Sequence, residues 1–128
     1  MKALARFTDA AYALLRMVAG FCFAFHGAQK VFGLFAPMKP ALRSQIGLGG
    51  IIELVCGLAV MVGFRTRWAA FLASGTMAVA YVQFHWKFQL GRALFPAVNE
   101  GELALLYAFL FLFIACQGGG RAALDREG

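Results

Sequence analysis

The sequence is poor in charged residues and in proline. Charged side chains make up 14% of its 128 residues, and only three prolines occur. A soluble domain carries about 25% charged residues. Here 62% of the residues are hydrophobic, and the mean hydropathy is +0.73. The scarcity of charge excludes an ordinary soluble domain and indicates a chain that folds in lipid.

The three cysteines lack the spacing of a disulfide or zinc framework. Cys22, Cys56 and Cys116 form no CxxC motif and fall inside apolar runs. We interpret them as small buried side chains, although a redox pair of Cys22 and Cys56 stays open. The sequence also contains no haem, flavin or iron–sulfur motif, so no covalently bound cofactor is expected.

Four apolar blocks are present, separated by polar and proline-containing segments. They cover approximately residues 10–35, 46–64, 68–88 and 99–116, and a short polar tail follows over 117–128. A bilayer core is crossed by about 20 helical residues, with a range near 17–25. The last block reaches that length only when its polar first turn is included. We therefore predict an all-α fold: a single transmembrane domain built as a four-helix bundle.

An even number of spans places both termini on one side of the membrane, together with the turn Arg65-Thr66-Arg67. Basic residues divide almost evenly between the two sides, so the positive-inside rule discriminates weakly. Arginines in a very short turn favour the cytoplasm, and we expect both termini there. The net charge of +6 then lies on both membrane surfaces, which predicts contact with anionic lipid headgroups and no nucleic acid.

Polar residues inside the apolar blocks fall on shared helical faces. An ionisable side chain near the bilayer centre costs at least about 2.5 kcal/mol, so it is expected to face the bundle interior and to find a partner. Glu53 is the only charged residue of its block. Glycines seven residues apart, Gly20 with Gly27 and Gly50 with Gly57, share these faces, and glycine allows helix backbones to approach closely.

The helical rise per residue places most of the polar groups at the same depth, on the side of the bundle opposite the termini. The members of this predicted cluster are His26, Lys30, Glu53, Tyr81, His85, Asn99 and Glu102. Arg16 lies closer to the other side, but a long guanidinium arm can reach a carboxylate. We therefore take Arg16 and Glu53 as ion-pair candidates, with Lys30 as the alternative partner of Glu53.

The residue types of this cluster leave its chemistry open. A buried ion-pair network can fix helix register with no further role. A metal site from His26, Glu53, His85 and Glu102 is compatible by residue type, but no ligand pair at i, i+4 supports one, and no metal is predicted. A neutral histidine and a protonatable carboxylate at membrane depth are the groups that bind a quinone carbonyl and pass its protons.

The ordered polar and glycine positions resemble the DoxX family. The matching segments are Arg16, Gly20, Gly27 and Lys30, then GGIIELVCGLAVMVGFRTRWAA over 49–70, FPAVNEGELALLYAFLFLF over 95–113 and GGGRAALD over 118–125. The resemblance implies a four-helix protein of the bacterial inner membrane that is associated with quinone-linked redox complexes. It carries over these family-type positions: Arg16, Lys30, Glu53, Arg67, Asn99, Glu102 and Asp125.

The residues and the resemblance together predict a redox-associated membrane subunit with a polar pocket near the outer face. A quinone and lipid are the expected ligands. The expected partners are the bilayer and other membrane subunits or further copies of the chain. An accessory subunit is favoured over a self-sufficient enzyme. The alternatives are a non-catalytic structural or assembly subunit, and a proton or small-solute conductor, for which four helices leave little room.

Overall fold

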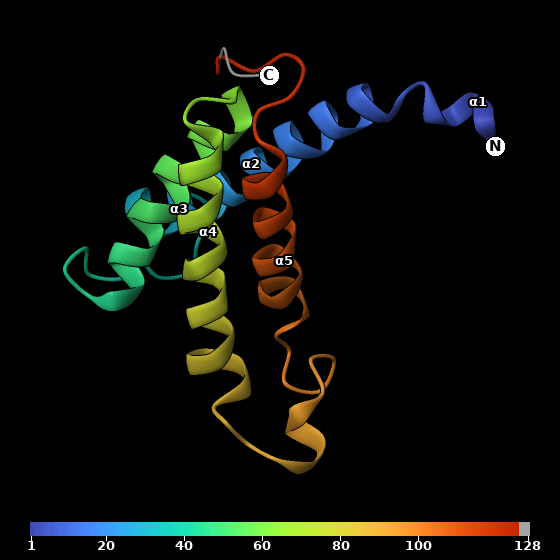
Figure 1. Ribbon diagram of the computed structural model, residues 1–128. Helices are drawn as coiled ribbons and strands as arrows, with labels where there is room; N and C mark the ends of the chain where they lie inside the picture. The colour runs from blue at the N-terminus through green and yellow to red at the C-terminus, as the bar shows by residue number, and fades with distance from the viewer. Residues whose placement is uncertain (126–128) are drawn as a thin grey trace.

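The computed structural model describes residues 1–125, so residues 126–128 of the predicted tail lie outside the described residues. Within 1–125 the chain is all-helical and contains no strand, which confirms the all-α prediction (Figure 1). Its elements are α1 (Lys2–Ala5), α2 (Thr8–Phe32), α3 (Gln45–Val62), α4 (Thr66–Ala80), the π-helical turn η1 (Tyr81–Trp86), the 3₁₀ turn η2 (Gly91–Leu94) and α5 (Glu102–Gln117).

Local sequence explains where the first two long helices end. Gly33 follows α2 with φ 72°, and Gly63 follows α3 with φ 73°. This left-handed conformation favours glycine and closes a helix. The first helix therefore ends before the position near 35 that hydrophobicity alone predicts. At its other end, α3 begins after Ser44, whose hydroxyl accepts a hydrogen bond of 3.1 Å from the Gly47 N–H.

The last helix begins at Glu102 and not near residue 99 as predicted. Asn99 forms a turn instead: its Oδ1 accepts a hydrogen bond of 2.9 Å from the Gly101 N–H, and its Nδ2 donates one of 3.0 Å to the Ala93 carbonyl. Glu100 between them has φ 61°. The asparagine side chain thus competes with helix formation at this point.

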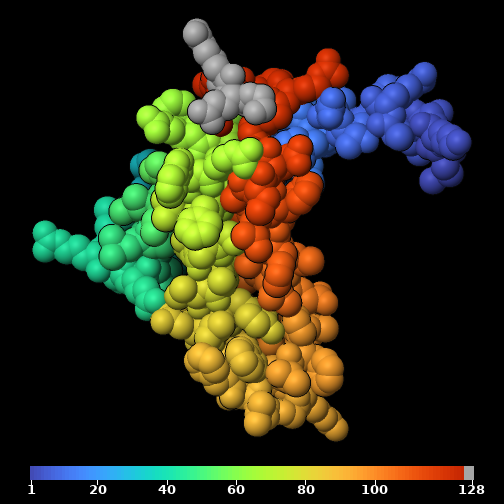
Figure 2. Space-filling view, in the orientation of Figure 1, coloured from blue at the N-terminus to red at the C-terminus, as the bar shows by residue number. Residues whose placement is uncertain are grey.

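The long helices contact one another in chain order: α2 packs on α3, α3 on α4, and α4 on α5. Figure 1 shows α4 and α5 side by side, with α2 crossing behind them. Aromatic contacts also join α2 to α5, with the rings of Phe23 and Phe111 4.6 Å apart. The start of the chain, comprising α1 and the first turns of α2, projects away from the other helices (Figure 2).

Glycines set the close approach of α2 and α3, as their spacing predicts. A Cβ at Gly27 would lie 2.2 Å from the backbone nitrogen of Leu54. A Cβ at Gly57 would lie 2.4 Å from the backbone nitrogen of Ala24. Only a residue without a side chain fits at such distances. Gly20 and Gly50 extend this contact on the same two helices.

The molecule carries small side chains inside and large apolar ones outside. Alanine dominates the buried apolar positions, and Phe111, Ile114 and Val60 are the large exceptions with no exposure. Large apolar side chains face outward on every long helix. Examples are Leu14, Phe21, Leu48, Val55, Phe71, Leu72, Leu106 and Phe109, each at least 50% exposed. This is the reverse of a soluble helical bundle, whose large apolar side chains face its core.

In the part of the chain that the structure describes, two helices have the length and composition to cross a membrane, namely α2 and α3. α5 is also apolar but shorter, with 16 residues. α4 continues directly into η1, so the two form one helical unit from Thr66 to Trp86.

Candidate functional site

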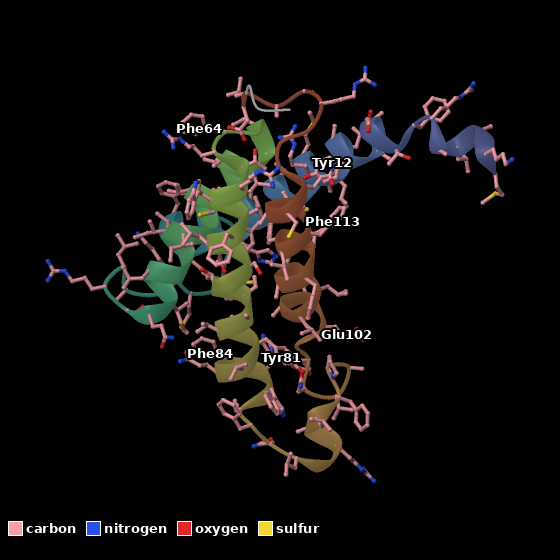
Figure 3. The ribbon with its side chains drawn as sticks, in the orientation of Figure 1. Tyr12, Phe64, Tyr81, Phe84, Glu102 and Phe113 are labelled. Atoms are coloured by element: carbon pink, nitrogen blue, oxygen red, sulfur yellow. The ribbon has the colours of Figure 1, made fainter. Side chains whose placement is uncertain are left out.

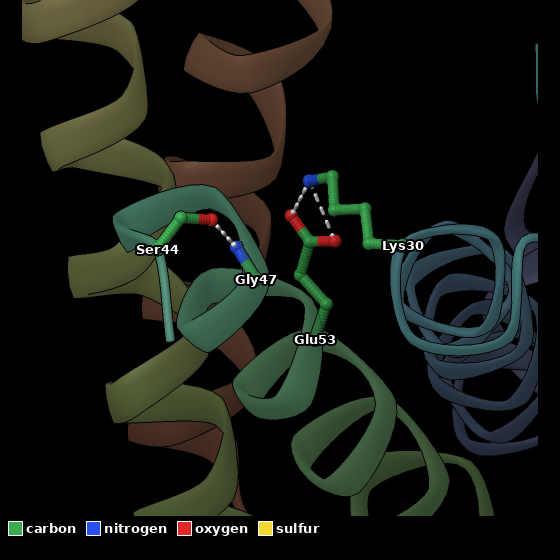
Figure 4. Close-up of polar contacts among 4 residues, drawn as sticks. All are labelled: Lys30, Ser44, Gly47 and Glu53. Carbon is green, nitrogen blue, oxygen red and sulfur yellow. Dashed lines mark hydrogen bonds and ion pairs between the residues drawn. The ribbon is translucent and has the colours of Figure 1, made fainter. Parts of the chain in front are cut away.

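A lysine of α2 and a buried glutamate of α3 form an ion pair. The Lys30 Nζ donates to both carboxylate oxygens of Glu53, at 2.6 Å to Oε1 and 2.8 Å to Oε2 (Figure 4). The Glu53 side chain is 3% exposed and the Lys30 side chain 34%. A buried carboxylate needs such a partner, because desolvation of an isolated charge is very costly.

The glycine contact is what allows this pair to form. A Cβ at Gly50 would lie 2.6 Å from the Cβ of Lys30, so the stem of Lys30 passes through the space that a side chain at Gly50 would occupy. Gly50 lies one turn before Glu53 on α3. The same glycine therefore admits the lysine and sets its ammonium beside the carboxylate.

The predicted ion pair of Arg16 with Glu53 is wrong, because Lys30 is the partner of Glu53 and Arg16 binds elsewhere. Arg16 is fully buried and binds backbone carbonyls at the other end of the molecule. Its Nη1 donates to Val60 at 2.8 Å and Met61 at 2.9 Å. Its Nη2 donates to the carbonyl of Arg121 at 3.3 Å and of Ala122 at 2.9 Å. The guanidinium thus caps the C-terminal end of α3, where the helix dipole favours positive charge.

The Lys30–Glu53 pair lies in the wall of a large, mostly apolar cavity. Its volume is about 920 Å³, and α2, α3, α4, η1 and α5 all contribute to its lining. The polar residues in the lining are His26, Lys30, Gln45, Glu53, Thr76, His85, Glu100 and Tyr107. The amide side chains of Gln45 and Gln83 are hydrogen-bonded to each other across the gap between α3 and η1. We name this space the α3–α4 cavity.

Four members of the predicted cluster share this cavity: His26, Lys30, Glu53 and His85. His85 lies in the π-helical turn η1, and π turns occur frequently at functional sites. In Figure 3 Phe84 lies on the side of η1 toward α3 and lines the same cavity.

The other three members lie apart from the ion pair. The Asn99 Nδ2 donates a hydrogen bond of 3.1 Å to the Tyr81 hydroxyl, so these two residues join η1 to the loop before α5. Glu102 is exposed and lines a separate small pocket of about 380 Å³ (Figure 3). Among residues 1–125 no three His, Cys, Asp or Glu side chains come together in a way that could hold a metal ion.

Several residues that line the cavity are not among those predicted from the sequence, including Thr76 and Tyr107. Thr76 and Tyr107 are weakly polar and lie within apolar runs, so their polarity gave no signal. Helical spacing does provide a signal for Tyr107. Leu103, Ala104 and Tyr107 are separated by one to four residues on one face of α5, and they line the cavity together. Tyr107 also stacks on Phe111, with ring centroids 5.5 Å apart.

Two further family-type positions, Arg67 and Asp125, cap helices at the opposite end of the molecule. Arg67 donates to the last carbonyls of α5, including that of Ala115 at 3.1 Å. The Asp125 carboxylate accepts from the backbone N–H groups of Arg65 at 2.6 Å and Thr66 at 2.8 Å, at the start of α4. Each charge therefore faces the helix end of opposite polarity.

These caps, with Arg16, hold the segment 118–125 across the helix ends, and we call this segment the C-terminal clasp. The Tyr12 hydroxyl donates to the Gly118 carbonyl, and the Asp125 N–H to the Gly63 carbonyl at 2.7 Å. Partial burial raises the pKa of the Asp125 carboxyl, but hydrogen bonds from Thr66 and Arg65 and the charge of Arg16 together hold that pKa below its usual value.

Over residues 1–125 the structure thus defines an all-helical protein with an apolar exterior and a buried ion pair between two of its long helices. The sequence model of the DoxX family matches residues 11–86. An uncharacterised protein of Haemophilus influenzae is 38% identical over 120 residues, which cover 90% of this chain and 88% of the relative. The chain belongs to the DoxX family, which confirms the resemblance. No solved structure matches it.

Proposed function

We propose that the chain crosses the bacterial inner membrane four times, as a four-helix bundle of α2, α3, α4 with η1, and α5. The exposed leucine, phenylalanine and valine side chains on all four helices support this, because lipid is the solvent in which such an exterior is stable. The caps on the helix ends fit the same setting, since unsatisfied backbone groups are costly near lipid. Both termini then lie on the cytoplasmic side.

Single-cysteine labelling tests this topology. A chain without its three native cysteines would carry one new cysteine at either Lys2 or Arg92, and intact cells would be treated with a membrane-impermeant maleimide. We expect labelling at 92 and none at 2 until the membrane is permeabilised. Labelling at both sites, or at neither before permeabilisation, contradicts four spans with cytoplasmic termini.

The function that we assign is quinone binding within a redox-associated membrane complex. The observation that carries it is the Lys30–Glu53 pair in the wall of the apolar α3–α4 cavity. Ligand sites are typically apolar spaces of roughly 300–1,000 Å³ with a few convergent polar groups. Lys30 has three N–H donors and gives two contacts to Glu53, so it retains a donor for a carbonyl oxygen in the cavity.

The residues around this pair include side chains that can transfer protons. His26 and His85 line the same cavity, and a histidine is the side chain whose charge changes most readily near neutral pH. A carbonyl held at Lys30 gains protons when it is reduced, and these histidines are the groups that would deliver them. The electrons would come from a partner protein, so the role is that of an accessory subunit.

Quinone retention tests this function. Protein purified from native membranes in a mild detergent would be extracted, and its quinone content measured against protein concentration. We expect near-stoichiometric quinone in the wild type and at least a fivefold loss in Glu53→Gln and His85→Ala. Glu102→Gln is the matched control, because Glu102 lies outside the cavity. A wild type without quinone contradicts the proposal.

A structural or assembly subunit is the second candidate, and one observation favours it. The ion pair spans the tight α2–α3 contact and can fix the register of these helices without a ligand. In that case a stoichiometric membrane partner would co-purify, and Glu53→Gln would leave the activity of the complex unchanged whenever the protein is folded.

A further inference from the structure

The α3–α4 cavity continues from the ion pair into an open apolar groove. Its volume of about 920 Å³ is near the upper end of the range for ligand sites. The walls away from Lys30 include Leu48, Phe71, Leu72 and Val79, and each of these side chains is at least 50% exposed. The cavity is therefore polar at one end and open along its apolar side.

Two glycines line this groove, and packing among residues 1–125 explains neither of them. Gly49 of α3 and Gly75 of α4 both contribute to the cavity, and a Cβ at either would have no heavy atom of a neighbouring segment within 4 Å. Glycine inside a helix is less favourable than alanine. At Gly27 and Gly57 the close backbone of the partner helix explains the choice, but Gly49 and Gly75 have no such contact.

We propose that Gly49 and Gly75 keep this groove open for the hydrocarbon chain of a quinone whose ring lies at Lys30. The inference rests on the proposed quinone function and extends it to the class of quinone, one with a long apolar chain. A side chain at either glycine would project into the groove. The apolar side chains that line the groove are exposed on the lipid-facing exterior of the proposed bundle. The ligand would therefore enter sideways from the bilayer and leave its chain between α3 and α4.

Two quinone probes with the same dimethoxy-methyl-benzoquinone ring test the inference, one without a side chain and one with a decyl chain. Binding to protein in lipid nanodiscs would be measured against empty nanodiscs. We expect the wild type to bind the decyl probe at least tenfold more tightly than the bare ring. Gly75→Leu should reduce this preference to under threefold and leave the affinity for the bare ring within twofold of the wild type.

Ala78→Leu is the matched control, since Ala78 is an exposed position of α4 outside the cavity lining. It should retain the full chain preference. Gly49→Leu provides the second variant, on the facing helix, and should behave as Gly75→Leu does. Unchanged thermal midpoints and circular dichroism would establish that each leucine variant is folded.

The outcomes separate this inference from the proposed function. A wild type that binds the bare ring but gains nothing from the decyl chain overturns the groove and leaves the quinone site standing. Equal behaviour of Gly75→Leu and Ala78→Leu also overturns it, as does a change of oligomeric state in Gly75→Leu with unaltered binding, which would make the glycine a contact between copies. A wild type that binds neither probe overturns the proposed function and this inference with it.

Discussion

The two partners of the ion pair differ in their access to surroundings. The Glu53 carboxylate is almost fully enclosed, whereas the Lys30 side chain is one-third exposed toward the cavity. Within residues 1–125 the salt bridge of Glu53 is made by Lys30, so loss of Lys30 leaves this carboxylate unpaired there. An unpaired lysine can reorient its flexible stem toward the cavity opening.

This asymmetry predicts unequal costs of removing each partner. Lys30→Met leaves a buried carboxylate and should cost about 3–5 kcal/mol of folding free energy. Glu53→Gln leaves only the more accessible ammonium, so it should cost less. The measurement is the unfolding transition of each variant in the same detergent.

A double variant provides the control for this prediction. Combining Lys30→Met with Glu53→Gln removes both charges, so the double variant should recover part of the stability that Lys30→Met alone loses. Equal losses in the two single variants, with simple additivity in the double variant, would contradict a coupled buried pair.

At the level of the helices, glycine has two distinct roles that the sequence does not distinguish. Gly50 and Gly57 permit contact with α2, and Gly49, one residue away from Gly50, faces the cavity. The helical twist alone separates them, because adjacent residues point about 100° apart around the axis. The predicted seven-residue glycine spacing identifies the glycines of the α2–α3 contact. Composition does not identify the glycines that line the cavity.

Alanine substitutions should therefore have opposite effects on stability. Gly57→Ala places a Cβ against the backbone of Ala24 and should destabilise the fold by about 1–3 kcal/mol or more through overpacking. Gly75→Ala meets nothing and should stabilise it by up to about 1 kcal/mol through helix propensity. Thermal midpoints under identical conditions provide the comparison. A loss of stability in Gly75→Ala equal to that in Gly57→Ala would refute the distinction.

Across the whole molecule, the C-terminal clasp joins the end of the chain to three different helices. Arg16 on α2, the start of α4 and the end of α3 all bind it through hydrogen bonds. The Asp125 carboxylate is the anionic member of this arrangement. Its pKa is lower in the folded state than in the unfolded chain, so it contributes stability that is fully present above the unfolded pKa of about 4 and is lost as the pH falls through the folded pKa.

The clasp should accordingly loosen in acid. We expect the backbone amides of Leu124 and Asp125, which bind carbonyls of α3 and its cap, to lose protection from hydrogen exchange as the pH falls below about 4. Asp125→Asn should show weak protection already at neutral pH and little further change in acid. Rates would be corrected for the intrinsic pH dependence of exchange. Asp9→Asn is the control, because Asp9 is exposed and lies outside the clasp, and it should keep the wild-type exchange profile. Full protection of these amides in Asp125→Asn at pH 7 would contradict the role of the Asp125 carboxylate in holding the clasp.

Arg16 marks the limit of prediction from residue type. Its burial was expected, because a cation within an apolar block must face inward. Its hydrogen-bond partners were not expected. Helical spacing predicts which face of the helix a residue lies on and its approximate depth in the membrane, but it does not predict where residues 118–125 lie. The carbonyls that bind Arg16 come partly from residues 121 and 122, more than a hundred positions away. No local pattern encodes that contact.

The sequence by itself determined the helical class, the family, the apolar exterior and the glycine contact of α2 with α3, because periodicity and composition are local properties of the chain. Only the tertiary structure decided that Lys30 neutralises Glu53, that Arg16 and Asp125 bind helix ends, and that a cavity opens between α3 and α4. The physical reason is the same for all three. Pairing of buried charges and the size of a cavity depend on distances of a few ångströms between helices, and those distances are set by how all the helices pack together.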